Sequence, residues 1–432
     1  LHKAIRRQRQ MCIRDRKNLC ITFFPHEKIS LEGEEDPVVV TTRRETDGSF
    51  FVSAKVYDVY RETTAKPEPA DEEHLVLSVT LYRLLSGILG FAPPWGVLYG
   101  VRPAKLMHRL CAQMGDDAAV AHFQTAFLTQ KSKAELAHEV MLHENRSIAR
   151  SGPKSFSLYV SIPFCPTRCA YCSFVSHSIE KTHKLMTPYV DLLLRELEET
   201  SKYAKELGLE LATVYFGGGT PTTLSAQDLG RIFTTIEQNF DLSHLMEYTV
   251  EAGRPDTVTR ERLEVIRAAG VQRISINPQS FNDKVLEAIG RRHTAQQTLD
   301  AFALARDCGF DHINMDFIAG LPEDDLPSFQ RSIQTALDLQ AESITVHTLA
   351  LKTSAYMVTR EQTFDLKDRL TVSNMVDYAG QTLHGAGYYP YYMYRQSKSL
   401  GNLENVGWCK PGYDCLYNVY MICLLYTSDA AD

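Results

Sequence analysis

The feature that most constrains the fold is an alternation of short apolar segments with longer amphipathic ones that begins near Ser157. The short segments are rich in β-branched and aromatic residues, which favour strands. The longer ones space their apolar residues as a helix does, as in 190–203 and 295–308. The predicted strands are 158–162, 213–216, 248–251, 273–277, 313–318 and 344–349. Alternating strand and helix predicts an α/β fold with a parallel sheet and right-handed crossovers.

The residues before this alternation have a different pattern. Two apolar segments, 38–42 and 49–54, flank Asp47-Gly48, which is a strong signal for a β-hairpin because glycine tolerates the positive φ of a tight turn. A helix is predicted over 75–88, and a linker at 151–154. We therefore expect a small α+β domain at 17–150, the α/β domain at 155–385, and the start of a C-terminal region at 386–422.

The two ends of the chain need separate treatment. The segments MCIRDR (11–16) and CLLYTSDAAD (423–432) resemble translated sequencing-library adaptor, and neither continues the pattern of its neighbours. We expect 1–16 and 423–432 to be non-native and exclude them from fold reasoning, as is done for tags. Natural frayed ends are the alternative. If the ends are non-native, Cys12 and Cys423 have no functional role.

Three cysteines follow the first predicted strand at once. Cys165, Cys169 and Cys172 have the spacing C-x3-C-x2-C in a chain of 432 residues with ten cysteines, so chance grouping is improbable. Three thiolates on one loop can hold three irons of a [4Fe–4S] cluster, which normally takes four. The fourth iron then stays open, as catalytic metal sites keep a position for substrate.

Zinc binding and disulfide formation account for these cysteines less well. A structural zinc site uses four ligands, usually as two spaced pairs, and the second pair here would come from the distant Cys409 and Cys415. We favour buried or surface thiols for those two. Disulfides are not expected, since no signal peptide is evident.

The segment 159–174, YVSIPFCPTRCAYCSF, resembles the cluster loop of radical S-adenosylmethionine (SAM) enzymes. Within them it is similar to the oxygen-independent coproporphyrinogen III oxidase family. The resemblance implies a partial (β/α)6 barrel preceded by a small α+β domain. It also implies a cluster whose open iron binds the amino and carboxylate groups of SAM, and a reductive cleavage that yields methionine and a 5′-deoxyadenosyl radical.

Polar and glycine residues stand where the predicted strands end, which is where the reactive groups of such a barrel collect. Gly217 to Pro221 follow the second strand, and glycines let a backbone approach a ligand closely. The sequence GGGTP resembles the family motif that meets the SAM amino group and carboxylate. The implied metal ligands are Cys165, Cys169 and Cys172. The implied SAM contacts are Tyr159, Tyr171, Gly218, Gly219, Thr220, Glu251, Gln279, Arg291, Asp316 and Ala350.

The resemblance also implies roles for single residues. Glu251 and Gln279 match SAM contacts, and Asp316 matches a ribose contact. Arg291 matches an arginine that holds the SAM carboxylate, a task that suits its planar fork, although Arg292 is adjacent. For the other positions, Ala350 would offer its backbone to the adenine, and the two tyrosines would lie beside SAM or simply pack under the loop.

Several features stay open at this stage. The candidate proton donors or ligands, for which a structural role is favoured, are His177, His293 and His347. The aromatic run 388–395 would line a porphyrin pocket or form an edge strand. Arg102 and Lys105 would meet an acidic ligand, or simply begin a helix at Pro103, which is the interpretation we favour.

The family resemblance points to a reaction and leaves two alternatives. The implied reaction is the oxidative decarboxylation of two coproporphyrinogen III propionates to the vinyl groups of protoporphyrinogen IX, with an electron donor for the cluster. Phe174 stands where the best-understood oxidases carry a further cysteine, and related heme chaperones also have phenylalanine there. A heme carrier, or a radical SAM enzyme on another substrate, is therefore the alternative. The resemblance of the N-terminal extension favours the oxidase, and the family would continue beyond residue 422.

Composition excludes some classes of partner. The formal charge of −7 and the lack of a long basic block argue against a nucleic-acid partner. No apolar run approaches the roughly 18 residues that a membrane-spanning helix needs. We expect a cytoplasmic protein, because an oxygen-sensitive cluster suits a reducing compartment.

Overall fold

The structure is a computed structural model that describes residues 16–24, 29–30, 36–69, 72–174, 176–350, 366–396 and 399–422. The chain divides into two compact units. The first consists mainly of the residues up to Met141 together with Tyr394–Glu404, and the second begins at Leu142. Each unit is described by itself. In the part of the chain that is described, no helix is both long and apolar enough to cross a membrane.

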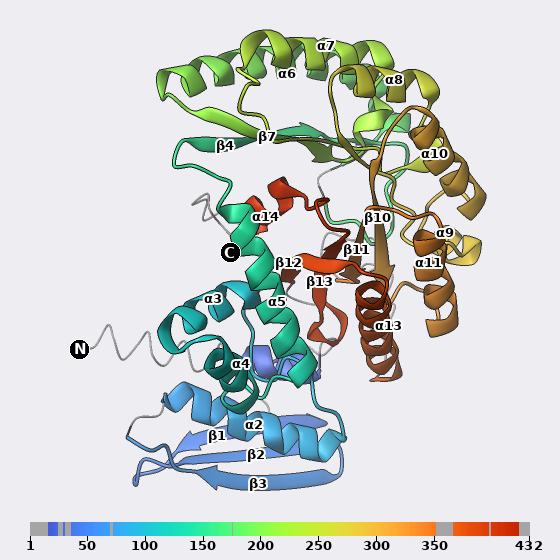
Figure 1. The fold of residues 1–432 in the computed structure, drawn as a ribbon. Helices are drawn as coiled ribbons and strands as arrows, with labels where there is room; N and C mark the ends of the chain where they lie inside the picture. The colour runs from blue at the N-terminus through green and yellow to red at the C-terminus, as the bar shows by residue number, and fades with distance from the viewer. Residues whose placement is uncertain are drawn as a thin grey trace. The chain divides into compact units, whose positions relative to one another are not determined.

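The first unit contains an antiparallel sheet with the order β1-β2-β3, formed by β1 (Val38–Arg44), β2 (Phe50–Val56) and β3 (Val59–Ala65). The turn between β1 and β2 contains Gly48 at φ 85°, so the predicted hairpin is confirmed. Helix α2 (Glu73–Leu89) packs on this sheet (Figure 1). The fully buried side chains of this layer are Leu19, Phe23, Val52, Ala54, Leu81 and Leu85.

Three further helices follow in the chain, namely α3 (Pro103–Met114), α4 (Asp116–Thr125) and α5 (Lys131–Ile148). Proline occupies the first turn of α3, where its missing N–H leaves no bond unmade, so the helix-start interpretation of this block is confirmed. Gly115, at φ 85°, both ends α3 and precedes α4. Its left-handed backbone allows two helices to be joined by one residue.

The second unit is built on the six predicted strands. They are β4 (Ser155–Ile162), β7 (Glu210–Gly218), β8 (Glu247–Glu251), β9 (Arg273–Ser275), β10 (His312–Ala319) and β11 (Ser343–Thr348). Neighbours pair in parallel and follow one another in chain order. The predicted α/β fold with a partial barrel is therefore confirmed, and all carboxyl ends of these strands lie at one edge of the sheet.

Helices connect these strands and lie along the outside of the curved sheet (Figure 1). They are α6 (Ile179–Glu206), α7 (Ala226–Asn239), α8 (Arg260–Ala268), α9 (Asp283–Ala288), α10 (Ala295–Asp307) and α11 (Leu326–Asp338). Polar residues cap several of their first turns by accepting backbone N–H bonds. These caps are Ser225, Thr259, Asn282, Thr294 and Asp325.

Two further strands extend this sheet; the sequence analysis left the first open as an edge strand and did not predict the second. After α13 (Leu366–Gly385), β12 (Tyr389–Arg395) and β13 (Glu404–Cys409) complete the order β12-β13-β11-β10-β9-β8-β7-β4. Strand β13 runs antiparallel to β11. The aromatic run is thus an edge strand, one of the two interpretations left open. Helix α14 (Leu416–Ile422) follows.

Candidate functional site

The cysteine loop leaves the end of β4. Cys165 closes the short strand β5 (Phe164–Cys165), which pairs in parallel with β6 (His177–Ser178). Cys169 is buried, whereas Cys165 and Cys172 are half-buried, and all three thiols are free. The N–H of Cys172 donates to the carbonyl of Cys169 at 3.2 Å, so the loop turns back on itself. Burial raises the pKa of the Cys165 and Cys172 thiols.

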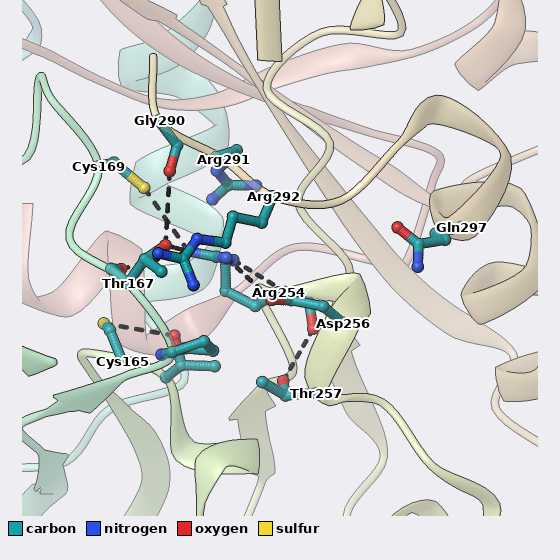
Figure 2. Close-up of polar contacts among 12 residues, drawn as sticks. Cys165, Thr167, Cys169, Arg254, Asp256, Thr257, Gly290, Arg291, Arg292 and Gln297 are labelled. Atoms are coloured by element: carbon teal, nitrogen blue, oxygen red, sulfur yellow. Dashed lines mark hydrogen bonds and ion pairs between the residues drawn. The ribbon is translucent and has the colours of Figure 1, made fainter. Parts of the chain in front are cut away.

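Residues more than a hundred positions further along the chain fix this loop. The N–H of Ala170 donates to the carbonyl of Ile289 at 2.9 Å. The Thr167 hydroxyl donates to the carbonyl of Gly290 at 3.4 Å (Figure 2). The loop is therefore positioned by tertiary contacts from the segment after α9, and not by its own sequence alone.

Arg254 is a functional candidate that the sequence analysis missed. It follows β8, is 3% exposed, and forms a paired interaction with Asp256 at 2.9 Å through both Nε and Nη2. Its Nη1 donates to the Thr167 carbonyl at 3.3 Å and reaches Cys169 Sγ at 3.9 Å (Figure 2). This contact places a cation beside one of the three candidate cluster ligands. The sequence does hold one signal that could have identified Arg254, namely a cationic residue shortly after the polar end of a predicted strand.

The glycine motif holds β7 against the cysteine loop. Gly218 has φ 102°, which favours glycine. A Cβ on Gly219 would lie 2.6 Å from the carbonyl oxygen of Phe164, so no side chain fits there. The Thr220 N–H donates to the same carbonyl at 2.7 Å, and its hydroxyl donates to Cys165 Sγ at 3.5 Å. The motif thus supports the loop directly.

Glu251 lies at the end of β8 and accepts a 2.6 Å hydrogen bond from the Tyr215 hydroxyl. Burial raises the pKa of Glu251 to about 7, although the Tyr215 bond opposes the shift. The Tyr215 ring stacks on Tyr417 with centroids 4.4 Å apart, and Tyr159 lies 6.0 Å from Tyr215. The Glu251 carboxyl group is therefore surrounded by aromatic rings. The hydrogen bond from Tyr215 stabilises its charged form only in part.

Asp316 occupies the middle of β10 and has more polar partners than Glu251. Asn314 Nδ2 donates to Asp316 Oδ1 at 2.7 Å, and His347 Nε2 lies 3.8 Å from Oδ2. Burial acts to raise the Asp316 pKa, but His347 and Asn314 outweigh it, so the pKa lies below its ordinary value. His347 is thus the candidate histidine that the fold brings to the site.

Gln279 and Arg291 carry buried polar atoms that the described residues leave without a partner. Gln279 has φ 68°, a strained conformation for a residue with a side chain, and its Oε1 has no hydrogen-bond partner. Arg291 is 8% exposed; Nη1 donates to the carbonyl of Asn277, while Nε has no partner. Buried polar atoms are nearly always paired in folded proteins, so these two indicate a missing ligand.

The neighbours of Arg291 settle which of two adjacent arginines faces inward. Arg292 is 68% exposed and pairs with Glu180 at 2.8 Å on the surface. Tyr171 is near Arg291, which opposes the rise in the Tyr171 pKa that burial causes. Arg291 is therefore the inward member.

The remaining candidates are less engaged. Ala350 follows β11 and is half-buried, at the end of a described segment. His177 is exposed on β6, and His293 is buried with both ring nitrogens unpartnered among the described residues. Burial lowers the His293 pKa to about 3. In the C-terminal region, Cys409 and Cys415 are buried thiols.

The arrangement fits a cluster and a polar cofactor. Three free thiols lie on one loop, and Arg254 reaches one of them. At the same sheet edge, Gln279 and Arg291 carry polar atoms that the described residues leave without a hydrogen bond.

Comparisons with known proteins agree with this geometry. A sequence profile of the radical SAM superfamily matches residues 159–336. The oxygen-independent coproporphyrinogen-III oxidase-like protein HemZ of Bacillus subtilis is 34% identical over 421 residues, covering 94% of this chain and 84% of that protein. The solved structure of coproporphyrinogen III oxidase (HemN) from Escherichia coli gives a TM-score of 0.49 at 24% identity, covering 63% of this chain and 59% of that one.

Heme chaperones are also similar. HemW of Bacillus subtilis is 38% identical over 197 residues, which is 45% of this chain and 51% of HemW. HemW of Escherichia coli is 32% identical over 263 residues, which is 61% of this chain and 65% of that protein. The chain belongs to the radical SAM superfamily, in the family of oxygen-independent coproporphyrinogen III oxidases and their close relatives the heme chaperones, and its cofactors are a [4Fe–4S] cluster and SAM.

Proposed function

We propose that this protein is an oxygen-independent oxidase that decarboxylates the propionates of coproporphyrinogen III to give protoporphyrinogen IX. The relative that is similar over 94% of the chain, the first unit included, bears an oxidase-like name. The heme chaperones align with 45% and 61% of the chain. The free state of the described cysteines supports a reducing compartment, and we place the reaction in the cytoplasm.

One observation carries the proposal for the cofactor site. Gln279 Oε1 and Arg291 Nε are buried without a hydrogen-bond partner among the described residues, at the sheet edge that also presents the three free thiols. Such atoms are costly in an empty protein and become satisfied when a polar molecule binds. When bound, the cluster and SAM supply a reductive cleavage that produces a radical able to abstract a hydrogen atom.

The residues then divide the work of holding the cofactor. Arg291 would offer its planar guanidinium to the SAM carboxylate, and Glu251 would pair with the SAM ammonium group, which would lower the raised pKa of Glu251. Asp316 would accept hydrogen bonds from the ribose hydroxyls. Tyr159 and Tyr171 would pack beside the cofactor, and the backbone of Ala350 would meet the adenine.

A second candidate function is that of a heme carrier. Phe174 is 67% exposed at the position where the best-understood oxidases have a further cysteine. An exposed aromatic ring beside the cysteine loop suits contact with a flat macrocycle. The similarity of this chain to heme chaperones supports this candidate.

Anaerobic turnover separates the candidates. The reconstituted protein is incubated with SAM, a chemical reductant in place of the electron donor, and coproporphyrinogen III, and products are analysed by mass. The oxidase predicts loss of two carboxyl groups and formation of deoxyadenosine. Stoichiometric heme uptake without turnover would instead support the carrier, and deoxyadenosine without a changed tetrapyrrole would point to another substrate. The Cys172→Ala variant must abolish SAM cleavage, and the Cys308→Ala variant is the matched control.

A further inference from the structure

A second group of metal-ligating side chains lies in the first unit, within the three-helix segment α3, α4 and α5. Cys111 is in the last turn of α3, Asp116 is the first residue of α4, and His138 is in the middle of α5. Their ligand atoms, a thiol sulfur, a carboxylate oxygen and an imidazole nitrogen, all lie within 4.8 Å of one another. Among the described residues this is the group whose side chains meet that spacing.

The spacing is close to that of the ligands of a single ion. Zinc ligands at about 2.0 to 2.3 Å in tetrahedral geometry lie roughly 3.3 to 3.8 Å apart. His138 Nε2 is 3.1 Å from Asp116 Oδ2, slightly less than this range and within ion-pair distance for a protonated imidazole. This buried nitrogen makes no hydrogen bond with any described residue. With the Cys111 sulfur inside 4.8 Å as well, the three atoms are spaced as the ligands of one centre would be.

We propose that Cys111, Asp116 and His138 bind one Zn²⁺ ion. Thiolate and imidazole ligands select zinc over magnesium or calcium, which prefer oxygen ligands alone. The Asp116 side chain is 56% exposed, so a water molecule completes the coordination from the solvent side. The ion joins the end of α3, the start of α4 and the middle of α5, and thereby stabilises the first unit independently of the cluster.

The site has a local structural cause. Gly115 joins α3 to α4 with φ 85°, and this tight connection brings Cys111 and Asp116 to the same point. The spacing C-x4-D is too common to signal a metal site by itself. Only the packing of α5, which adds His138, makes the set recognisable.

Zinc binding is measured on the full chain carrying its iron–sulfur cluster, after treatment with a chelator, by competition with a chromogenic zinc indicator. We expect one equivalent of Zn²⁺. Cys111→Ser and His138→Ala should each weaken binding by more than about tenfold, because loss of even an outer-shell partner costs 10- to 100-fold. The matched controls Cys20→Ser and His108→Ala should bind as the parent does.

Cobalt(II) serves as a spectroscopic probe of the same site. We expect a thiolate-to-cobalt charge-transfer band in the parent that disappears in Cys111→His, which keeps a ligand and therefore keeps zinc binding. This variant distinguishes a lost sulfur ligand from a misfolded unit. Equal zinc affinity in the parent, Cys111→Ser and His138→Ala would overturn the proposal.

The cluster cysteines must not be the source of the signal. In the Cys165→Ala/Cys169→Ala/Cys172→Ala background, the single zinc equivalent and the cobalt band should persist. If both vanish there, the metal was bound at the cluster loop and the proposed site does not exist. Cluster absorbance and iron content of Cys111→Ser should equal those of the parent, so a failure of this site is separable from a failure of the proposed function.

Discussion

Two buried glutamates, one in each unit, have different hydrogen-bond partners and pKa values that are shifted in opposite directions. In the first unit Glu404 is 1% exposed and accepts from Lys133 Nζ at 2.5 Å and from Trp95 Nε1 at 2.7 Å. Burial acts to raise the Glu404 pKa, but Lys133 and Trp95 outweigh it and the pKa is lowered. In the second unit Glu251 accepts a hydrogen bond from the Tyr215 hydroxyl, and its pKa is raised to about 7.

The difference separates a structural charge from a functional one. A buried carboxylate with a cation and an N–H donor is satisfied by the protein itself. One that keeps a raised pKa is stabilised less by the fold and is open to a ligand that brings a positive charge. The comparison therefore predicts that the charge of Glu404 contributes to the stability of the first unit. The charge of Glu251 contributes instead to cofactor binding in the second unit.

The largest effect is expected from the cluster loop. Cys169→Ala should reduce SAM cleavage to the uncatalysed background. A cluster that has lost one of its three cysteine ligands is no longer held in place with its fourth iron open to SAM. Deoxyadenosine formation under anaerobic conditions is the measurement. Cys415→Ala, at another buried thiol of the same unit, is the control for the effect of the substitution itself. Residual cleavage well above background in Cys169→Ala would remove this cysteine from the ligand set.

The next effect is on stability. Glu404→Ala should lower the free energy of unfolding by about 3 to 5 kcal/mol, because it removes the carboxylate that forms a buried ion pair with Lys133. The double variant Lys133→Met/Glu404→Gln should regain most of the loss, since the amide still accepts from Trp95. Urea denaturation followed by tryptophan fluorescence measures both. If the double variant is no more stable than Glu404→Ala, the ion pair is not the cause.

A third prediction uses the opposite signs of the two pKa shifts. The raised pKa of Glu251 means that the folded state holds this proton more tightly. The Glu251 contribution to the free energy of unfolding should therefore fall as pH rises from 4.5 to about 7 and stay level above that, while the lowered pKa of the buried His293 contributes in the opposite direction up to about pH 6.5. The slope is at most about 1.4 kcal/mol per pH unit.

The lowered pKa of Glu404 gives stability that is present above the unfolded pKa and is lost as pH falls through the lower folded value. Unfolding curves across this pH range test both signs. The difference in unfolding free energy between the parent and Glu251→Gln should fall between pH 4.5 and about 7, because the contributions of the other titrating groups cancel in this difference. A difference that stays level across this range would contradict the raised pKa of Glu251.

The smallest effect is expected from one hydroxyl. Tyr215→Phe keeps the ring stacked on Tyr417 but removes the bond to Glu251. Because this bond lowers the Glu251 pKa, its loss should raise that pKa by roughly half a unit to one unit. The pH-dependent decline in stability should then extend upward by the same amount. Tyr248 lies in the neighbouring strand β8, and its hydroxyl has no hydrogen-bond partner among the described residues. Tyr248→Phe is therefore the matched control.

Much of the fold could be predicted from the sequence because its signals are local. The six parallel strands and the Asp47-Gly48 hairpin depend on periodicity and turn chemistry within a few residues. Strand β13 was missed because all six of its residues are buried, so it has no polar face to reveal a period of two. Its place beside β11 is decided by tertiary packing.

The site was less predictable for the same reason. The only local signal for Arg254 is a cation after the end of a strand, and Tyr417 has none, because their contacts join segments that are far apart in the chain. The choice between Arg291 and Arg292 requires knowing which side chain turns inward, and the exposure of Arg292 decides it. Residue identity predicts the chemistry of a site, whereas the contacts that hold its side chains in place depend on the fold.

The hydrogen bonds between the cysteine loop and the segment at Ile289 and Gly290 have a consequence for metal loading. The loop is held at Thr167 and Ala170, so these two contacts meet part of the entropic cost of ordering the three cysteines. The affinity that this ordering would otherwise consume is then retained for the cluster. A mutation around residue 289 would act as a defect of maturation, producing iron-poor protein with an intact set of ligands.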